Sequence, residues 1–182
     1  MIRSSRFFWL LVIAGALLLV KGSFAVYPSL FPNPTAQLSL SSDLTSSVRF
    51  EPGAALFELS LPAHSAAFTV VEGTTAAALR KGPGHLEGTP LPGEHGNVVI
   101  AGHRDTHFRV LKDVLIGDEI RVESARRDYT YRITDIRIVS PKDTHVLRPQ
   151  SRAALTLITC YPFRYLGPAP ERYVVQALLV EP

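Results

Sequence analysis

The sequence predicts a mostly-β domain, and its bends favour a barrel. Between residues 55 and 180, seven or eight short apolar runs are separated by loops rich in glycine and proline, and helical segments are short. Within residues 129–139 the apolar positions change parity, because Tyr131 and Ile133 share one face whereas Ile136 and Ile138 belong to the other. Such a change requires a bulge or bend, as in a curved or closed sheet.

The length and composition of the chain exclude several classes of protein. The chain has 182 residues, which suits one domain plus an appendage, and it carries a net charge of +3. Its arginines are scattered along the sequence, which argues against nucleic-acid binding. The single cysteine, Cys160, excludes an internal disulfide framework.

Residues 1–27 predict an export signal. Two arginines precede an uninterrupted apolar run over residues 7–20, and Lys21 follows. The run alone suits the core of a signal peptide cleaved after Ala25. Extension to residue 27 gives about twenty residues, enough to span a membrane if Lys21 reaches the interface. We favour the uncleaved membrane anchor, with its positive charge on the inside.

The segments after the anchor predict a tether and then the start of the domain. Residues 28–52 are rich in proline, serine and threonine, which is typical of a tether, and the domain occupies residues 53–182. Residues 55–71 hold two apolar runs separated around Pro62, and we interpret them as two strands. Residues 74–81 predict a short helix with a threonine cap.

The middle of the domain predicts a buried strand that ends at a histidine. A glycine- and proline-rich loop extends to Gly96, and we expect His85 and His95 within it to be solvated. Residues 97–102 then form an apolar strand, and His103 follows directly. This places an imidazole at a strand end, where a rigid element fixes its position.

The second half of the domain predicts four further strands. Residues 119–123 and 129–139 form a hairpin, and residues 155–160 form an apolar strand that ends on Cys160. The last strand, residues 173–180, is almost wholly apolar and is therefore expected to be central. Arg172 stands immediately before it.

His103, Cys160 and Arg172 are the candidate catalytic residues, because each lies at the boundary of a predicted strand. They meet at one end of the sheet if the strand of Cys160 pairs antiparallel with the strand after Arg172 and parallel with the strand before His103. An ordinary thiol is only a few per cent ionised at neutral pH, and a nearby imidazole raises its reactive fraction and protonates a leaving amine. A guanidinium suits the oxyanion formed by attack on a carbonyl. Acyl transfer through a thioester is the reaction class that this set predicts.

The segments that carry these residues resemble the sortase family. TLITC at residues 156–160 is similar to the segment around the family's nucleophile, AGHRDT at 101–106 to its histidine segment, and ERYVV at 171–175 to its arginine segment. The three occur in the family's order, and the likeness covers roughly residues 55–180. The stretch 161–172 most resembles class D or the Gram-negative class of sortases.

The resemblance implies a closed eight-stranded β-barrel and a transpeptidase tethered to the bacterial cytoplasmic membrane, with its catalytic domain on the extracytoplasmic side. Such enzymes cleave an LPxTG-like C-terminal sorting signal of a surface protein and pass the acyl group to an amine acceptor at the cell envelope. By match, Cys160 would be the nucleophile, His103 the acid/base, and Arg172 the stabiliser of oxyanion and substrate. Thr159 would help to position the substrate. No cofactor or metal is implied.

Three alternatives remain open at this stage. A cysteine peptidase would use the same residues with water as acceptor, and a non-catalytic β-barrel would recognise a peptide without cleaving it. A metal-dependent hydrolase could use the H-x-D-x-H pattern of His103, Asp105 and His107. That segment leaves a strand for a loop, so the spacing does not place all three ligands on one face.

Overall fold

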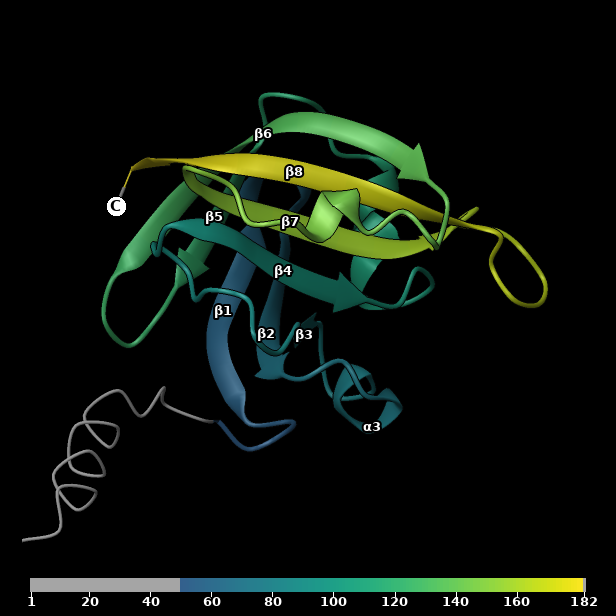
Figure 1. Ribbon diagram of the computed structural model, residues 1–182, viewed down its shortest axis with the longest axis horizontal. Helices are drawn as coiled ribbons and strands as arrows, with labels where there is room; N and C mark the ends of the chain where they lie inside the picture. The colour runs from purple at the N-terminus through teal and green to yellow at the C-terminus, as the bar shows by residue number, and fades with distance from the viewer. Residues whose placement is uncertain (1–49, 182) are drawn as a thin grey trace, which may run out of the picture. The chain divides into compact units, whose positions relative to one another are not determined.

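The computed structural model describes residues 50–181, and its strands form a closed barrel (Figure 1). Eight strands are hydrogen-bonded in the order β1-β2-β3-β4-β7-β8-β6-β5, and β5 pairs again with β1. The predicted closed eight-stranded barrel with short helices is therefore confirmed. The predicted anchor (1–27) and nearly all of the tether (28–52) lie outside the described residues. Within 50–181, no helix has the length and apolarity needed to cross a membrane.

The first elements follow the predicted order. Strands β1 (Ala55–Leu61) and β2 (Ala66–Glu72) form an antiparallel hairpin around the 3-10 turn η3 (Pro62–His64). Helix α3 (Ala76–Leu79) begins after Thr75, whose hydroxyl accepts a hydrogen bond from the backbone amide of Ala78 at 3.2 Å. The threonine cap is confirmed, although the helix is shorter than residues 74–81.

The remaining elements complete the barrel. They are strands β3 (Gly84–His85) and β4 (Gly96–Gly102), the 3-10 segment η4 (His107–Lys112), strands β5 (Glu119–Glu123) and β6 (Asp128–Val139), the turn η5 (His145–Leu147), and strands β7 (Ala153–Tyr161) and β8 (Glu171–Glu181). Strand β8 lies between β6 and β7, as expected for a nearly continuous apolar strand.

The core lies inside the barrel, and η4 packs against it. Alternate residues of neighbouring strands, such as Ile100, Leu157 and Val175, are fully buried within it, and η4 adds Phe108 and Leu111. The pairing of β6 with β8 shifts register between Ile133 and Asp135. This irregularity is the predicted bulge, and it lets one long strand follow the curvature of the barrel.

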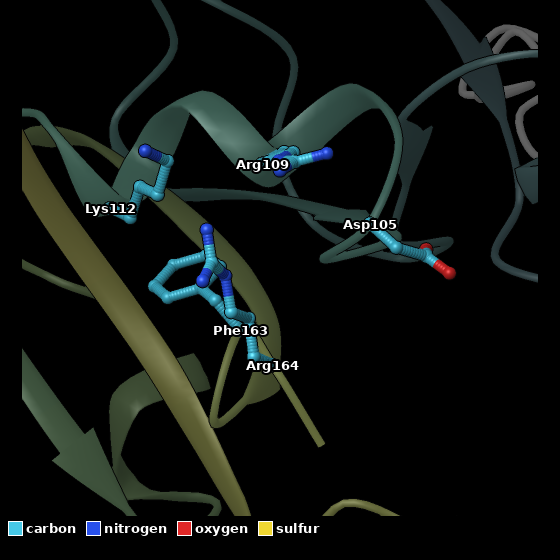
Figure 2. Close-up of a pocket in the computed structure, with 5 residues that line it drawn as sticks. All are labelled: Asp105, Arg109, Lys112, Phe163 and Arg164. Atoms are coloured by element: carbon cyan, nitrogen blue, oxygen red, sulfur yellow. The ribbon is translucent and has the colours of Figure 1, made fainter. Parts of the chain in front are cut away.

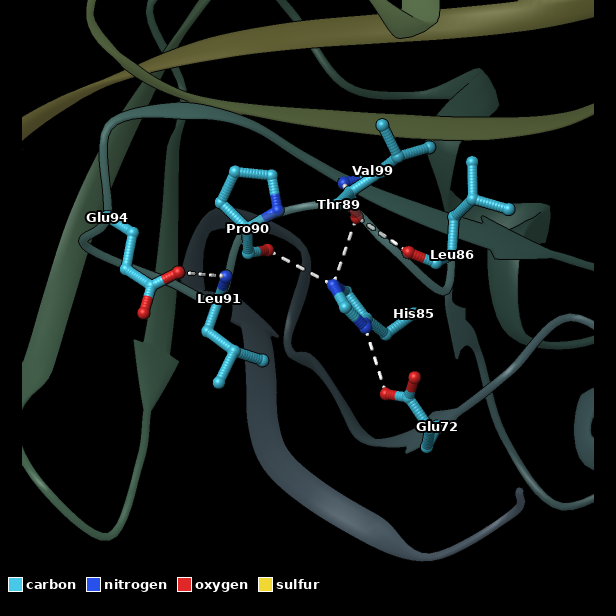
Figure 3. A network of polar contacts seen from close by, with 8 residues as sticks. All are labelled: Glu72, His85, Leu86, Thr89, Pro90, Leu91, Glu94 and Val99. Carbon is cyan, nitrogen blue, oxygen red and sulfur yellow. Dashed lines mark hydrogen bonds and ion pairs between the residues drawn. The ribbon is translucent and has the colours of Figure 1, made fainter. Parts of the chain in front are cut away.

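The expectation for His85 is wrong, because its side chain is buried among polar partners rather than solvated (Figure 3). His95 is exposed, as expected. His85 pairs with Glu72 across β3 and β2, and its Nδ1 lies 2.9 Å from Glu72 Oε2. Its Nε2 lies 3.1 Å from the Pro90 carbonyl oxygen and 3.0 Å from Thr89 Oγ1. These polar partners hold the loop before β4 against the sheet and compensate the burial of the ring.

Candidate active site

Two strand pairings bring the predicted catalytic residues to one end of the sheet. Strands β4 and β7 are parallel, with Gly102 opposite Thr159, and His103 follows Gly102 directly. Strands β7 and β8 are antiparallel, with Cys160 directly opposite Arg172. These are the pairings on which the sequence argument depended, and both are present. His103, Cys160 and Arg172 therefore lie within neighbouring register positions.

Cys160 lies on the outer face of the barrel. Leu155 and Leu157 of β7 point into the core, and alternation along the strand places Ile158 and Cys160 on the opposite face. Arg172 shares this face, because directly paired residues of antiparallel strands project to the same side. Cys160 is half-buried and forms no disulfide. Its thiol is thus on a rigid strand with access for a substrate.

The chain that leads to His103 is held by a buried hydrogen bond. The Thr159 hydroxyl donates to the Gly102 carbonyl oxygen at 2.7 Å, and Thr159 is almost fully buried. Gly102 also has no room for a side chain, since a Cβ there would lie 2.6 Å from the Phe108 ring. Both features fix the end of β4 at Gly102, and the exposed His103 follows it directly. Thr159 thus supports the histidine segment, and its predicted contact with substrate stays a prediction.

The Arg172 guanidinium is anchored beside the thiol-bearing strand. Its Nη1 donates to the Glu171 carbonyl oxygen at 2.9 Å and to the Ala169 carbonyl oxygen at 3.3 Å. Its other donors remain available for a substrate carbonyl or an oxyanion. Within residues 50–181, no side-chain hydrogen bond joins Cys160, His103 and Arg172 to one another. Catalytic hydrogen bonds are often long without substrate and shorten when it binds.

Arg104 is a site residue that the sequence analysis missed. It follows His103 and reaches the loop between β7 and β8, where Nη1 donates to the Pro162 carbonyl oxygen at 3.1 Å. Its Nη2 donates to the carbonyl oxygens of Tyr165 and Gly167 at 3.0 and 3.4 Å, and the guanidinium lies 5.9 Å from the centre of the Tyr165 ring. Arg104 therefore connects the histidine segment to the loop that follows the cysteine.

An aromatic cluster fixes the start of the same loop. The Phe163 and Tyr173 rings lie 5.0 Å apart, and Tyr161 stacks on Tyr173 at 5.9 Å. Burial raises the pKa of Tyr173, and the neighbouring Tyr161 raises it further. The phenol of Tyr173 therefore stays neutral at physiological pH, and the packed rings hold the start of the loop against β8.

The outer face of β7 is covered at one end and open at the other. Asn97 Nδ2 donates to the Val146 carbonyl oxygen of η5 at 3.0 Å, and its Oδ1 accepts from the Thr156 hydroxyl at 2.7 Å. Toward Cys160 the outer-face residues Ala101 and Ile158 are half-buried and not covered in this way. The outer face of β7 therefore carries an open apolar strip that leads to Cys160.

The H-x-D-x-H pattern does not come together as a metal site. Within residues 50–181, no group of three or more histidine, cysteine, aspartate or glutamate side chains has the geometry to hold a metal ion. The His107 ring instead packs edge-on against Phe68, at 6.1 Å between ring centres. Asp105 lies at a separate cavity beside η4.

Replacing Arg104 with glutamine or lysine is expected to lower kcat by about 10- to 100-fold, with a smaller change in the KM for peptide. Neither side chain can make the same forked set of hydrogen bonds, so the histidine segment and the β7–β8 loop would shift relative to each other, and small displacements of reacting groups carry costs of this size. Faster amide hydrogen exchange in residues 162–170 should accompany the loss. Arg126→Gln, in the exposed turn after β5, is the control. A kcat within twofold of wild type in both Arg104 variants would contradict this role.

Comparison with known proteins agrees with the geometry. The sequence matches the Sortase domain family model over residues 59–180. It is 40% identical to Sortase D of Bacillus subtilis (strain 168) over 126 residues, which is 69% of this chain and 64% of that protein. It is 31% identical to Sortase SrtE1 of Streptomyces coelicolor, over 62% of this chain and 38% of that protein. The chain thus spans less than two thirds of the length of these two relatives.

Solved structures show the same likeness. A Clostridium perfringens Sortase D5 transpeptidase matches with a TM-score of 0.67 and 29% identity, over 78% of this chain and 88% of that one. Sortase A from Corynebacterium diphtheriae matches with a TM-score of 0.66 and 34% identity, over 73% of this chain and 63% of that one. The resemblance therefore extends from three short motifs to the whole barrel.

Proposed function

The chain belongs to the sortase family, and on this premise we propose that it is a cysteine transpeptidase. It cleaves an LPxTG-like sorting signal through a thioester on Cys160 and transfers the acyl group to an amine acceptor at the cell envelope. One observation carries the proposal: Cys160 pairs directly with Arg172, and His103 follows the residue that pairs with Thr159. A thiol, an imidazole and a guanidinium thus share one end of the sheet.

The first half-reaction forms the thioester. The Cys160 thiolate attacks the carbonyl carbon of the signal's threonine, and the developing oxyanion is stabilised by the Arg172 guanidinium. The bond between that carbon and the following amide nitrogen then breaks. His103, as imidazolium, donates a proton to the departing amine. The acyl chain remains on sulfur, extended along the open strip of the outer face.

The second half-reaction releases the acyl chain. A neutral amine attacks the thioester carbonyl, His103 accepts the proton that the amine loses, and the thiolate departs. Each group returns to its starting state, so no oxidant, metal or cofactor is required. Water in place of the amine would give a peptidase, with the same residues in the same roles.

The location and class of the enzyme form part of the proposal. Residues 1–27 would anchor the chain in the bacterial cytoplasmic membrane, and residues 28–52 would hold the barrel on its extracytoplasmic side. The 40% identity to Sortase D, together with the match to a Sortase D5 transpeptidase, supports a class D type of enzyme.

The experiment incubates the full chain in detergent micelles with a labelled peptide that contains LPxTG, with and without a primary amine. The proposal expects an acyl adduct on the peptide that contains Cys160, and an amine-linked product that forms when amine is present. A thiol reagent should stop both, whereas a chelator should stop neither. Cleavage with an adduct but no amine product would favour the peptidase. Inhibition by the chelator but not by the thiol reagent would favour the metal-dependent hydrolase. Peptide binding without cleavage would favour the non-catalytic β-barrel that recognises a peptide.

A further inference from the structure

A small cavity lies next to the catalytic end of the sheet and is lined mainly by cations (Figure 2). Its volume is about 160 Å³, and the lining residues are Asp105, Arg109, Lys112, Phe163 and Arg164. Arg109 and Lys112 come from η4, whereas Phe163 and Arg164 come from the loop after β7. Two segments that are distant in sequence therefore bring three positive charges to one place.

Two of these charges have no ionic partner in the part of the chain that is described. The ion pairs within residues 50–181 include none for Arg109 or Arg164, while Lys112 pairs with Asp113 at 3.1 Å. In Figure 2 the Arg164 guanidinium points toward η4, and the Asp105 carboxylate points away from it. Like charges held close together are unfavourable, and an anion between them would relieve the repulsion.

The cavity lies between the two chain segments that leave the catalytic residues. Asp105 is the second residue after His103, and Phe163 is the third residue after Cys160. The Phe163 ring is fixed by its contacts with Tyr161 and Tyr173. A ligand in this cavity would therefore lie between the chain segments that follow His103 and Cys160, against a phenylalanine ring that is held by its neighbours.

We propose that this cavity binds a carboxylate carried by the acceptor, so that the preferred acceptor is an amine whose own molecule also bears a carboxylate. The inference rests on the proposed function. An LPxTG-like signal has no carboxylate at a constant position within its motif, so it gives these cations no constant partner. The acceptor is the other substrate, and it must approach the thioester from the open side of Cys160.

The cations suit this role in two ways. A guanidinium binds a carboxylate through two parallel hydrogen bonds, which orient the ligand as well as hold it. Their positive potential also favours the neutral form of a nearby amine over the ammonium form, and the neutral amine is the nucleophile. One cavity would thus select the acceptor and raise its reactive fraction.

The test measures transfer from the same labelled peptide to two matched pairs of acceptors, with the full chain in detergent micelles. One pair is glycine and glycinamide; the other is Nα-acetyl-lysine and its amide, which places the amine farther from the carboxylate. Because a free carboxylate makes a neighbouring amine more basic, each rate is expressed per concentration of neutral amine. At low salt, at least one acid is expected to have a kcat/KM about tenfold above that of its amide. Because the cations are exposed, this preference should weaken as salt is raised.

Variants of the cavity arginines provide the second measurement. In Arg164→Gln, and more fully in the double variant with Arg109→Gln, the ratio of acid to amide should fall toward one. Arg126→Gln removes an equal charge from the turn between β5 and β6. This turn lies at one end of β6, and the opposite end of β6 is the one that pairs with Arg172. This control should keep the wild-type ratio.

Two outcomes would overturn the inference. One is a wild-type ratio near one for both acceptor pairs, which needs no variant and holds even if a variant folds poorly. The other is a preference that survives in the folded double variant. Either result with a normal acyl adduct on Cys160 would leave the proposed function intact. Absence of the adduct and of peptide cleavage would instead remove the proposed function, and the acceptor site with it.

Discussion

Replacing Cys160 with alanine is expected to abolish both cleavage of the sorting peptide and transfer to amine. The thiol is the nucleophile of the proposed reaction, and the neighbouring His103 and Arg172 cannot form the covalent intermediate without it. Loss of an enzyme's nucleophile typically lowers kcat on the order of 10⁴-fold or more. Release of the labelled fragment and the mass of the intact chain after incubation with peptide would measure the effect.

The fold should survive this change, which makes the result interpretable. Cys160 is half-buried on the outer face and forms no hydrogen bond through sulfur within residues 50–181, so alanine removes little packing. The thermal midpoint is expected to stay within a few degrees of wild type, and the variant should still bind the peptide. Cleavage within tenfold of the wild-type rate would refute the thioester mechanism.

Most of the strands could be predicted from sequence because their signals are local; β3 (Gly84–His85) falls in the predicted loop, and β8 begins at Glu171, so Arg172 lies within it rather than before it. Apolar runs, the threonine before α3 and the change of parity in β6 each depend on neighbouring residues, and the structure agrees with all three. The placement of Cys160, His103 and Arg172 at strand ends followed from the same local signals. Their proximity required two pairings between distant strands, which the sequence analysis assumed and the structure contains.

The features that could not be predicted depend on contacts between distant segments. His85 looked like a histidine in a glycine-rich loop, but a parallel pairing of β3 with β2 places it beside Glu72, and burial follows from that partner. Arg104 appeared in the sequence only as part of the histidine segment, and its acceptors lie about 60 residues further along the chain. Neither set of partners can be recognised from the residues next to His85 or Arg104, because the barrel topology brings them together.

Thr159 illustrates how the structure changes the meaning of a motif. The residue before the cysteine appeared to belong to the substrate site by its position in TLITC. The structure shows its hydroxyl buried and donating to the Gly102 carbonyl oxygen. That hydrogen bond connects the cysteine strand to the histidine strand, so the motif fixes the distance between two catalytic segments as well as presenting the thiol.

Replacing His103 with alanine is expected to lower kcat/KM by about 10²–10⁴-fold, the usual contribution of a general acid–base group. Without the imidazole, the leaving amine departs unprotonated and the incoming amine keeps its proton. Added imidazole should restore part of the activity, because His103 is exposed at the end of β4 and the space it vacates is open to solvent.

His107→Ala is the matched control, and it separates the acid–base role from a metal site. Both histidines belong to the H-x-D-x-H pattern, so a metal hydrolase would lose its activity in either variant. The His107 ring packs against Phe68, whereas His103 lies at the end of β4, directly after Gly102. An acid–base role therefore requires a large loss in His103→Ala, partial rescue by imidazole, and near-normal turnover in His107→Ala. Equal losses in both variants, restored by a divalent metal rather than by imidazole, would overturn the assignment of His103.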